Sequence, residues 1–176
     1  MFRIVPRVIR GGDSGLLTKA GQMVTYARED VLRQEFWPIA HEVLRLARFP
    51  SEHDEKGRLQ AIYDFVFGLV FVVAPPIATQ YLLRPEALYE RRMGDCTAFA
   101  TFCAAAGGVY GFRSALVFAS TIPSGEWEHV WARFFLPARS RQTFIDCDPS
   151  YRKAGAGLGW ALPDAKCTRL VEVEVM

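Results

Sequence analysis

The sequence predicts an α+β fold, with helices in the first half of the chain and strands in the second. Apolar residues recur at helical spacing between residues 30 and 49. In the second half, short segments rich in Val, Phe or Ile are bounded by Pro, Gly or Ser, which is typical of strands. Helices followed by strands favour an antiparallel sheet. The length of 176 residues predicts a single domain over residues 1–176.

The first half is expected to hold two main helices. Pro38 must kink the first helix or begin a new one, because proline cannot continue a helix interior. Ser51 is the expected N-cap of the second helix. The elements expected here are, in chain order, an edge strand within 2–9, a loop over 11–15, a helix over 30–49, a helix from about 51 towards 73, and a helical turn over 85–89.

An apolar run over residues 65–78 needs a separate interpretation. It contains 14 uncharged residues, with Asp64 before it and Pro75-Pro76 inside it. A membrane-spanning helix needs about 20 apolar residues. The run is therefore expected to be a buried helix or strand of the core.

The second half is expected to open with a central helix. This helix should begin at Cys96, extend to about Ala106 and stop at Gly107-Gly108, since glycine is a frequent helix terminator. Cys103 falls on the same helix two turns after Cys96 and is expected in the core, as is Cys147. The strands expected after this helix cover residues 114–120, 129–136, 143–148 and 168–175.

Composition narrows the classes of function. The formal net charge is +2 with scattered basic residues, so neither a nucleic-acid partner nor a membrane partner is expected. The four cysteines include no C-x-x-C pair, which argues against a zinc site. The sequence contains no phosphate loop or dinucleotide fingerprint, so we expect no cofactor. No signal peptide is recognisable, and a cytoplasmic or virion-associated protein is expected.

The segment Gly94-Asp95-Cys96 is the most informative motif of the chain. Cys96 directly precedes an Ala-rich helical run. A thiol in the first turn of a helix faces unpaired backbone N–H groups and the positive end of the helix dipole. Both favour the thiolate, which is the nucleophilic form. Asp95 could cap this helix or take part in chemistry.

A histidine and an acid follow on the expected strands. His129 opens one strand, and Asp146 and Asp148 lie on the next. A cysteine at a helix start with a histidine and an acid on successive strands is the arrangement that nucleophilic acyl transfer requires. Asp146 and Asp148 share a strand face, so either could point at His129. We expect Asp146 to be the orienting acid, because Asp148 precedes Pro149 at the strand exit.

The same reasoning indicates how an oxyanion would be held. The backbone N–H of Cys96 is one expected donor. Gln80 or the indole N–H of a tryptophan could supply the second. Trp131 shares a strand face with His129 and could wall the site or simply pack in the core.

These motifs resemble the transglutaminase-like superfamily, a branch of the papain-like cysteine enzymes, and in particular its small stand-alone bacterial and phage members. Gly94-Asp95-Cys96, His129-Val130-Trp131 and Ile145-Asp146 carry the resemblance, which covers about residues 60–150. It implies a papain-like fold in which Cys96 is the nucleophile, His129 its base and Asp146 the orienting acid. Gln80 falls in a stretch that resembles the family's polar segment before the cysteine. Thr97, Ala98 and Asp148 depart from the family pattern.

The resemblance implies cysteine-dependent acyl transfer to an amine, or hydrolysis of an amide bond as in a cysteine protease or amidase, with a peptide or protein substrate. Two alternatives stay open. The chain could be a structural or binding module of a phage particle or bacterial assembly that retains the fold. It could also be an NlpC/P60-type cell-wall peptidase, although Asp-Cys is usually followed by Ser-Gly there and by Thr97 here.

Overall fold

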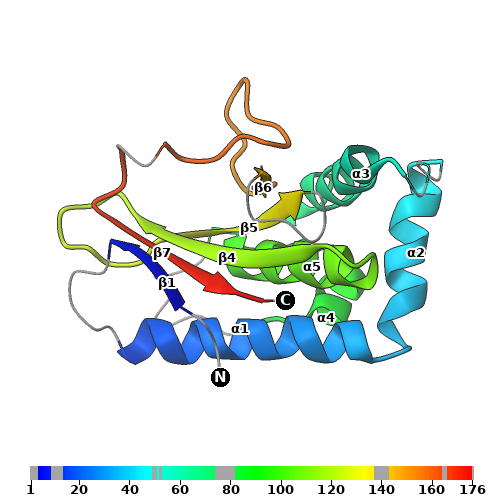
Figure 1. Ribbon diagram of the computed structural model, residues 1–176, viewed down its shortest axis with the longest axis horizontal. Helices are drawn as coiled ribbons and strands as arrows, with labels where there is room; N and C mark the ends of the chain where they lie inside the picture. The colour runs from blue at the N-terminus through cyan, green and yellow to red at the C-terminus, as the bar shows by residue number, and fades with distance from the viewer. Residues whose placement is uncertain are drawn as a thin grey trace.

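The computed structural model (Figure 1) describes residues 4–8, 14–48, 51, 53–73, 82–136, 143–163 and 166–175. Helices and a sheet make up this part of the chain, as the α+β prediction requires. The helices are α1 (Ser14–Leu32), α2 (Phe36–Leu46), α3 (Glu55–Phe67), α4 (Pro85–Arg91) and α5 (Cys96–Val109). The strands are β1 (Ile4–Val8), β2 (Val70–Phe71), β3 (Met93–Gly94), β4 (Arg113–Ser120), β5 (His129–Leu136), β6 (Thr143–Cys147) and β7 (Arg169–Glu174).

The main sheet has five strands in the order β1-β7-β4-β5-β6, and every neighbouring pair is antiparallel. β1 lies at one edge, so the expected edge strand is confirmed. β6 lies at the other edge, beside β5. A separate two-stranded parallel pair, β2 with β3, places Gly94 opposite Phe71 just before the central helix.

Helix α5 is the centre of the hydrophobic core. Every residue from Cys96 to Gly107 is buried. One side of α5 packs on β4 and β5, and α1 and α4 also pack against it (Figure 1). Because its small side chains let these elements approach closely, α5 is held on several sides.

Gly107 lies inside α5 rather than ending it. A Cβ built at this position would lie 2.3 Å from Cε1 of Phe134 on β5. The expectation that Gly107-Gly108 stops the helix is therefore wrong: α5 continues to Val109 with Tyr110 as its C-cap. At this position glycine permits close contact between α5 and the sheet and does not reverse the chain.

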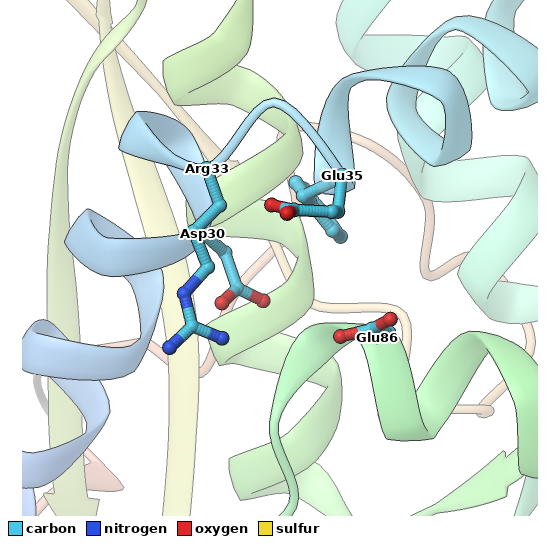
Figure 2. Close-up of a pocket in the computed structure, with 5 residues that line it drawn as sticks. Asp30, Arg33, Glu35 and Glu86 are labelled. Atoms are coloured by element: carbon cyan, nitrogen blue, oxygen red, sulfur yellow. The ribbon is translucent and has the colours of Figure 1, made fainter.

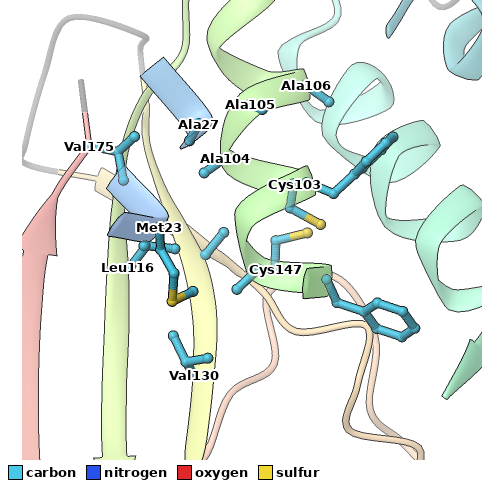
Figure 3. Packing of buried hydrophobic residues seen from close by; sticks show 14 of the residues in the cluster. Met23, Ala27, Cys103, Ala104, Ala105, Ala106, Leu116, Val130, Cys147 and Val175 are labelled. Carbon is cyan, nitrogen blue, oxygen red and sulfur yellow. The ribbon is translucent and has the colours of Figure 1, made fainter. Parts of the chain in front are cut away.

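Figure 3 shows the core between α1, α5 and the sheet. Cys103 and Cys147 are fully buried in it, as expected. The hydrogen bond between the thiol of Cys147 and the neighbouring Cys103, together with burial, raises the pKa of Cys147 well above its ordinary value. A thiol held in this way stays neutral, so Cys147 serves packing and not nucleophilic chemistry.

The opposite face of the sheet carries a smaller apolar cluster. Val117, Ala119, Trp131 and Leu170 form it, and three residues of the segment between β6 and β7 pack against them: Ala161, Leu162 and Cys167. This segment arches over the sheet in Figure 1. The sheet is thus covered by helices on one face and by a long connection on the other.

Several boundaries in the first half differ from expectation. α1 starts at Ser14, where only a loop is expected, and its long apolar face is buried against α5. The expected helix over 30–49 is in fact two, because the chain breaks after Leu32 and Pro38 falls in the first turn of α2. Asp54, not Ser51, caps α3: its carboxylate accepts a hydrogen bond of 2.8 Å from the N–H of Gly57.

The apolar run is only partly buried. Residues 65–67 complete α3 and Val70–Phe71 form β2, but Val70 and Val73 are 59 % and 86 % exposed. The expectation of a buried core segment is wrong for these residues, and residues 74–81 lie outside the described part. No described helix combines the length and apolar character that crossing a membrane requires.

Candidate active site

Cys96 is the first residue of α5, at the end of the central helix nearest β3. Asp95 caps the helix: its Oδ1 accepts hydrogen bonds from the N–H of Ala98 at 2.9 Å and from Oγ1 of Thr97 at 2.6 Å. Gly94 lies so close to Leu88 that a Cβ would approach its Cδ1 to 2.6 Å. The cap and this close approach fix the backbone on which Cys96 sits.

His129 is the first residue of β5, opposite Ala119 of β4. Its Nε2 lies 2.6 Å from Oδ2 of Asp148, and its side chain also hydrogen bonds to Cys96. Because Asp148 occupies Nε2, the ring's other nitrogen, Nδ1, is left for the Cys96 sulfur. The structure thus brings together the predicted nucleophile and the predicted base.

The electrostatics of His129 favour its protonated form. Burial alone would lower the pKa of this imidazole. Hydrogen bonds to Asp148 and Cys96, together with the negative charge of both partners, outweigh burial and raise the pKa of His129 to about 10. At neutral pH the site therefore stabilises an imidazolium beside the sulfur.

Asp148 is the acid that orients His129. It follows β6 directly, and its side chain is 1 % exposed. Its Oδ2 faces His129, while Oδ1 accepts a 2.6 Å hydrogen bond from Oγ of Ser150. Both carboxylate oxygens are occupied, which holds the group in one orientation.

The expectation that Asp146 orients His129 is wrong. Its Oδ1 accepts hydrogen bonds from Nε of Arg133 at 2.7 Å and from Nε1 of Trp131 at 2.9 Å. Its Oδ2 accepts a 3.0 Å hydrogen bond from Nη2 of Arg133. Asp146 is thus bound by a buried arginine instead of the histidine.

The register of the two strands explains this correction. Asp146 lies opposite Arg133, four residues from His129 along β5, which is about 13 Å of strand. Extending the same register places Asp148 opposite Trp131, next to His129. The place of Asp148 at the strand exit before Pro149 does not remove it from the site, because antiparallel pairing brings the end of β6 towards the start of β5.

Two aromatic rings lie next to the imidazole of His129. The ring of Trp131 lies 5.8 Å from the imidazole at an interplanar angle of 33°, and the ring of Tyr151 lies 6.4 Å away in an edge-on arrangement. Tyr151 in turn stacks on Trp160 at 4.0 Å. Trp131 therefore walls the site and packs in the core at the same time.

The structure shows which of the side-chain donors expected for an oxyanion already have a hydrogen-bond partner. The Trp131 indole N–H is already donated to Asp146, and that of Trp37 is donated to the carbonyl of Val31. The Trp127 indole N–H is buried and has no hydrogen-bond partner among the described residues. Gln80 lies outside the described residues.

A separate pocket lies between the α1–α2 turn and the start of α4 (Figure 2). It has a volume of about 430 Å³ and is lined by Asp30, Arg33, Glu35, Phe36 and Glu86. None of these residues belongs to the Cys96 site. Across the described ranges, no group of three or more His, Cys, Asp or Glu side chains is arranged to hold a metal ion.

Comparison of the sequence with models of known protein families finds no matching family, and comparison with curated proteins finds no match.

Proposed function

We propose that this protein is a cysteine-dependent acyl transferase or amide hydrolase of transglutaminase-like type, acting through Cys96, His129 and Asp148. The observation that carries the proposal is the chain of contacts from Cys96 through His129 to Asp148, with 2.6 Å between His129 Nε2 and the carboxylate. A cysteine at a helix start, served by a histidine and an acid from two neighbouring strands, is suited to acyl transfer. The resemblance in the sequence motifs favours the same class.

In the proposed reaction the Cys96 thiol transfers its proton to Nδ1 of His129, forming a thiolate–imidazolium pair. The thiolate attacks the carbonyl carbon of an amide, and a C–S bond forms as the carbonyl oxygen becomes an oxyanion. When the intermediate collapses, the C–N bond breaks and His129 returns the proton to the leaving amine. Water or a second amine, deprotonated by His129, then attacks the thioester and releases Cys96.

Asp148 supports each proton transfer without taking the proton itself. Its carboxylate fixes the ring so that Nδ1 faces the sulfur, and its charge stabilises the imidazolium. Ser150 holds Asp148 in place by a 2.6 Å hydrogen bond. Asp148 and Ser150 are both buried, so water screens the hydrogen bond between them only a little.

The proposal assigns two donors to the oxyanion. The backbone N–H of Cys96 belongs to the first turn of α5, whose N–H groups have no partner within the helix. The indole N–H of Trp127, two residues before His129, is buried and has no hydrogen-bond partner in the described part of the chain. We assign it as the second donor in this proposal.

The experiment that tests the proposal is an intact-mass scan against panels of peptide amide and ester donors, with and without a primary amine. A mass increase equal to the acyl group, absent in Cys96→Ala, is expected. Turnover with amine incorporation would indicate transfer, and turnover without it would indicate hydrolysis. Release of stem peptides from peptidoglycan would favour the cell-wall peptidase instead. A chain that never forms an adduct with any donor would contradict an enzymatic role and favour a structural module.

A further inference from the structure

Three charged side chains form a buried cluster on the sheet face opposite the helices. Arg133 binds Asp146 through two hydrogen bonds and Glu172 through a third of 3.0 Å. All three residues are less than one-tenth exposed. The cluster joins the adjacent strands β5 and β6 to β7, which lies on the far side of β4.

Asp146 connects this cluster to the rings that flank His129. Its side chain accepts a hydrogen bond from the indole N–H of Trp131, the first of the two rings next to the histidine. Its backbone carbonyl accepts a 2.8 Å hydrogen bond from the N–H of Gly159, the residue before Trp160. Trp160 stacks on Tyr151, the second ring next to the histidine.

We propose that Asp146 is a positioning residue that holds both aromatic walls of His129 and thereby fixes the imidazole between Cys96 and Asp148. This inference rests on the proposed function, because the Cys96–His129 pair is what the walls position. Arg133 supports Asp146, because the two hydrogen bonds that Arg133 donates hold the Asp146 carboxylate in one orientation.

The chemistry of the cluster supports a role in orientation. A buried ion pair often adds little net stability compared with apolar side chains of similar volume, because each charge loses its hydration. A carboxylate that is paired with an arginine is held rigidly, so it accepts a further hydrogen bond at a defined angle. The Trp131 indole N–H donates to this rigidly held carboxylate. The Arg133 guanidinium carbon lies 4.0 Å from the centre of the Phe144 ring.

The test uses Trp131→Phe, which keeps an aromatic ring but removes the N–H that Asp146 accepts. Glu172→Gln is the matched control, because it alters the same cluster without touching the Trp131–Asp146 hydrogen bond. Two readouts are followed in the full chain: exchange of the His129 Nε2–H proton by NMR, and the rate of Cys96 alkylation by iodoacetamide at pH 7. Melting temperature reports the structural effect of each variant.

The inference predicts that Trp131→Phe accelerates exchange of the His129 proton and slows Cys96 alkylation, each by about tenfold or more, because a loosened ring is misplaced. Glu172→Gln should lower the melting temperature yet keep both readouts within about twofold of the wild type. If the two variants lower the melting temperature alike and neither moves the His129 proton, Asp146 is only structural and the inference fails.

Failure of the proposed function would look different. A wild-type chain that holds the His129 proton firmly but forms no acyl adduct would overturn the enzymatic proposal, while the effect of Trp131→Phe on that proton would still decide the role of Asp146. A Trp131→Phe variant that fails to fold would be replaced by Trp160→Leu. That change removes the ring that stacks on Tyr151, the second aromatic neighbour of His129, and is expected to move the same two readouts.

Discussion

Replacing Asp148 with asparagine tests the electrostatic core of the site. The substitution would keep the shape of the side chain but remove the negative charge that lies 2.6 Å from His129 Nε2. The pKa of His129 rises from 6.5 to about 10 in the folded protein, which corresponds to a preference for the imidazolium of roughly 5 kcal/mol. Without the Asp148 carboxylate, burial opposes the charge and only Cys96 supports it. We therefore expect the pKa of His129 to fall by several units in Asp148→Asn.

The assay is an NMR titration of the His129 ring, identified by its absence in His129→Gln, together with single-turnover acylation. Acylation should drop by about 10⁴-fold, as expected when an amide replaces the orienting carboxylate of such a triad. Asp64→Asn, at an exposed carboxylate on α3, is the matched control and should leave both measurements unchanged. An Asp148→Asn variant whose His129 titrates as in the wild type would refute the assignment of Asp148.

Three further predictions concern stability, each measured by urea unfolding. Because the pKa of His129 is raised in the folded protein, the contribution of His129 to stability is fully present below pH 6.5 and is lost as pH rises to about 10. His129→Gln should remove this part of the pH dependence. An unchanged slope of unfolding free energy against pH in this variant would contradict the prediction. Gly107→Ala should destabilise by about 1–3 kcal/mol because its Cβ would meet Phe134, whereas Gly157→Ala, with open space around it, should have little effect. Arg133→Met should cost about 3–5 kcal/mol by leaving two buried carboxylates without their cation; the partly exposed pair of Arg113 and Glu174 is the comparison, and Arg113→Met should cost at most about 1 kcal/mol.

Much of the fold can be predicted because local patterns decide it. The strand over residues 129–136 is predicted with its observed bounds, since β-branched and aromatic residues bounded by loop residues specify a strand. α1 escapes prediction because its helical pattern is weak by itself and becomes clear only through its burial against α5. The end of α5 is misplaced because the packing of Gly107 under Phe134 is a tertiary contact that sequence spacing does not reveal.

The candidate site, like the fold, can be predicted from the sequence only in part. Cys96 and His129 can be found from the sequence because a helix start and a strand start have local signals. The choice between Asp146 and Asp148 depends on the register of β5 against β6, which spacing alone leaves open. One signal is present: Arg133, a charged residue among the apolar side chains of residues 130–136, needs a buried partner, and Asp146 provides it. Trp127 gives no signal, because its lack of a hydrogen-bond partner among the described residues is visible only in the fold.

The central claim is that His129 makes Cys96 a nucleophile, and competition among the four thiols tests it most directly. Cys96 is 5 % exposed, whereas Cys167 is the most accessible of the four thiols. Limiting iodoacetamide at about pH 6, followed by peptide mass analysis, should label Cys96 before Cys167, because only the thiolate reacts and Cys96 is the thiol that faces an imidazolium. His129→Ala should reverse that order. Labelling that follows exposure in the wild type, or an order that His129→Ala leaves unchanged, would contradict the account.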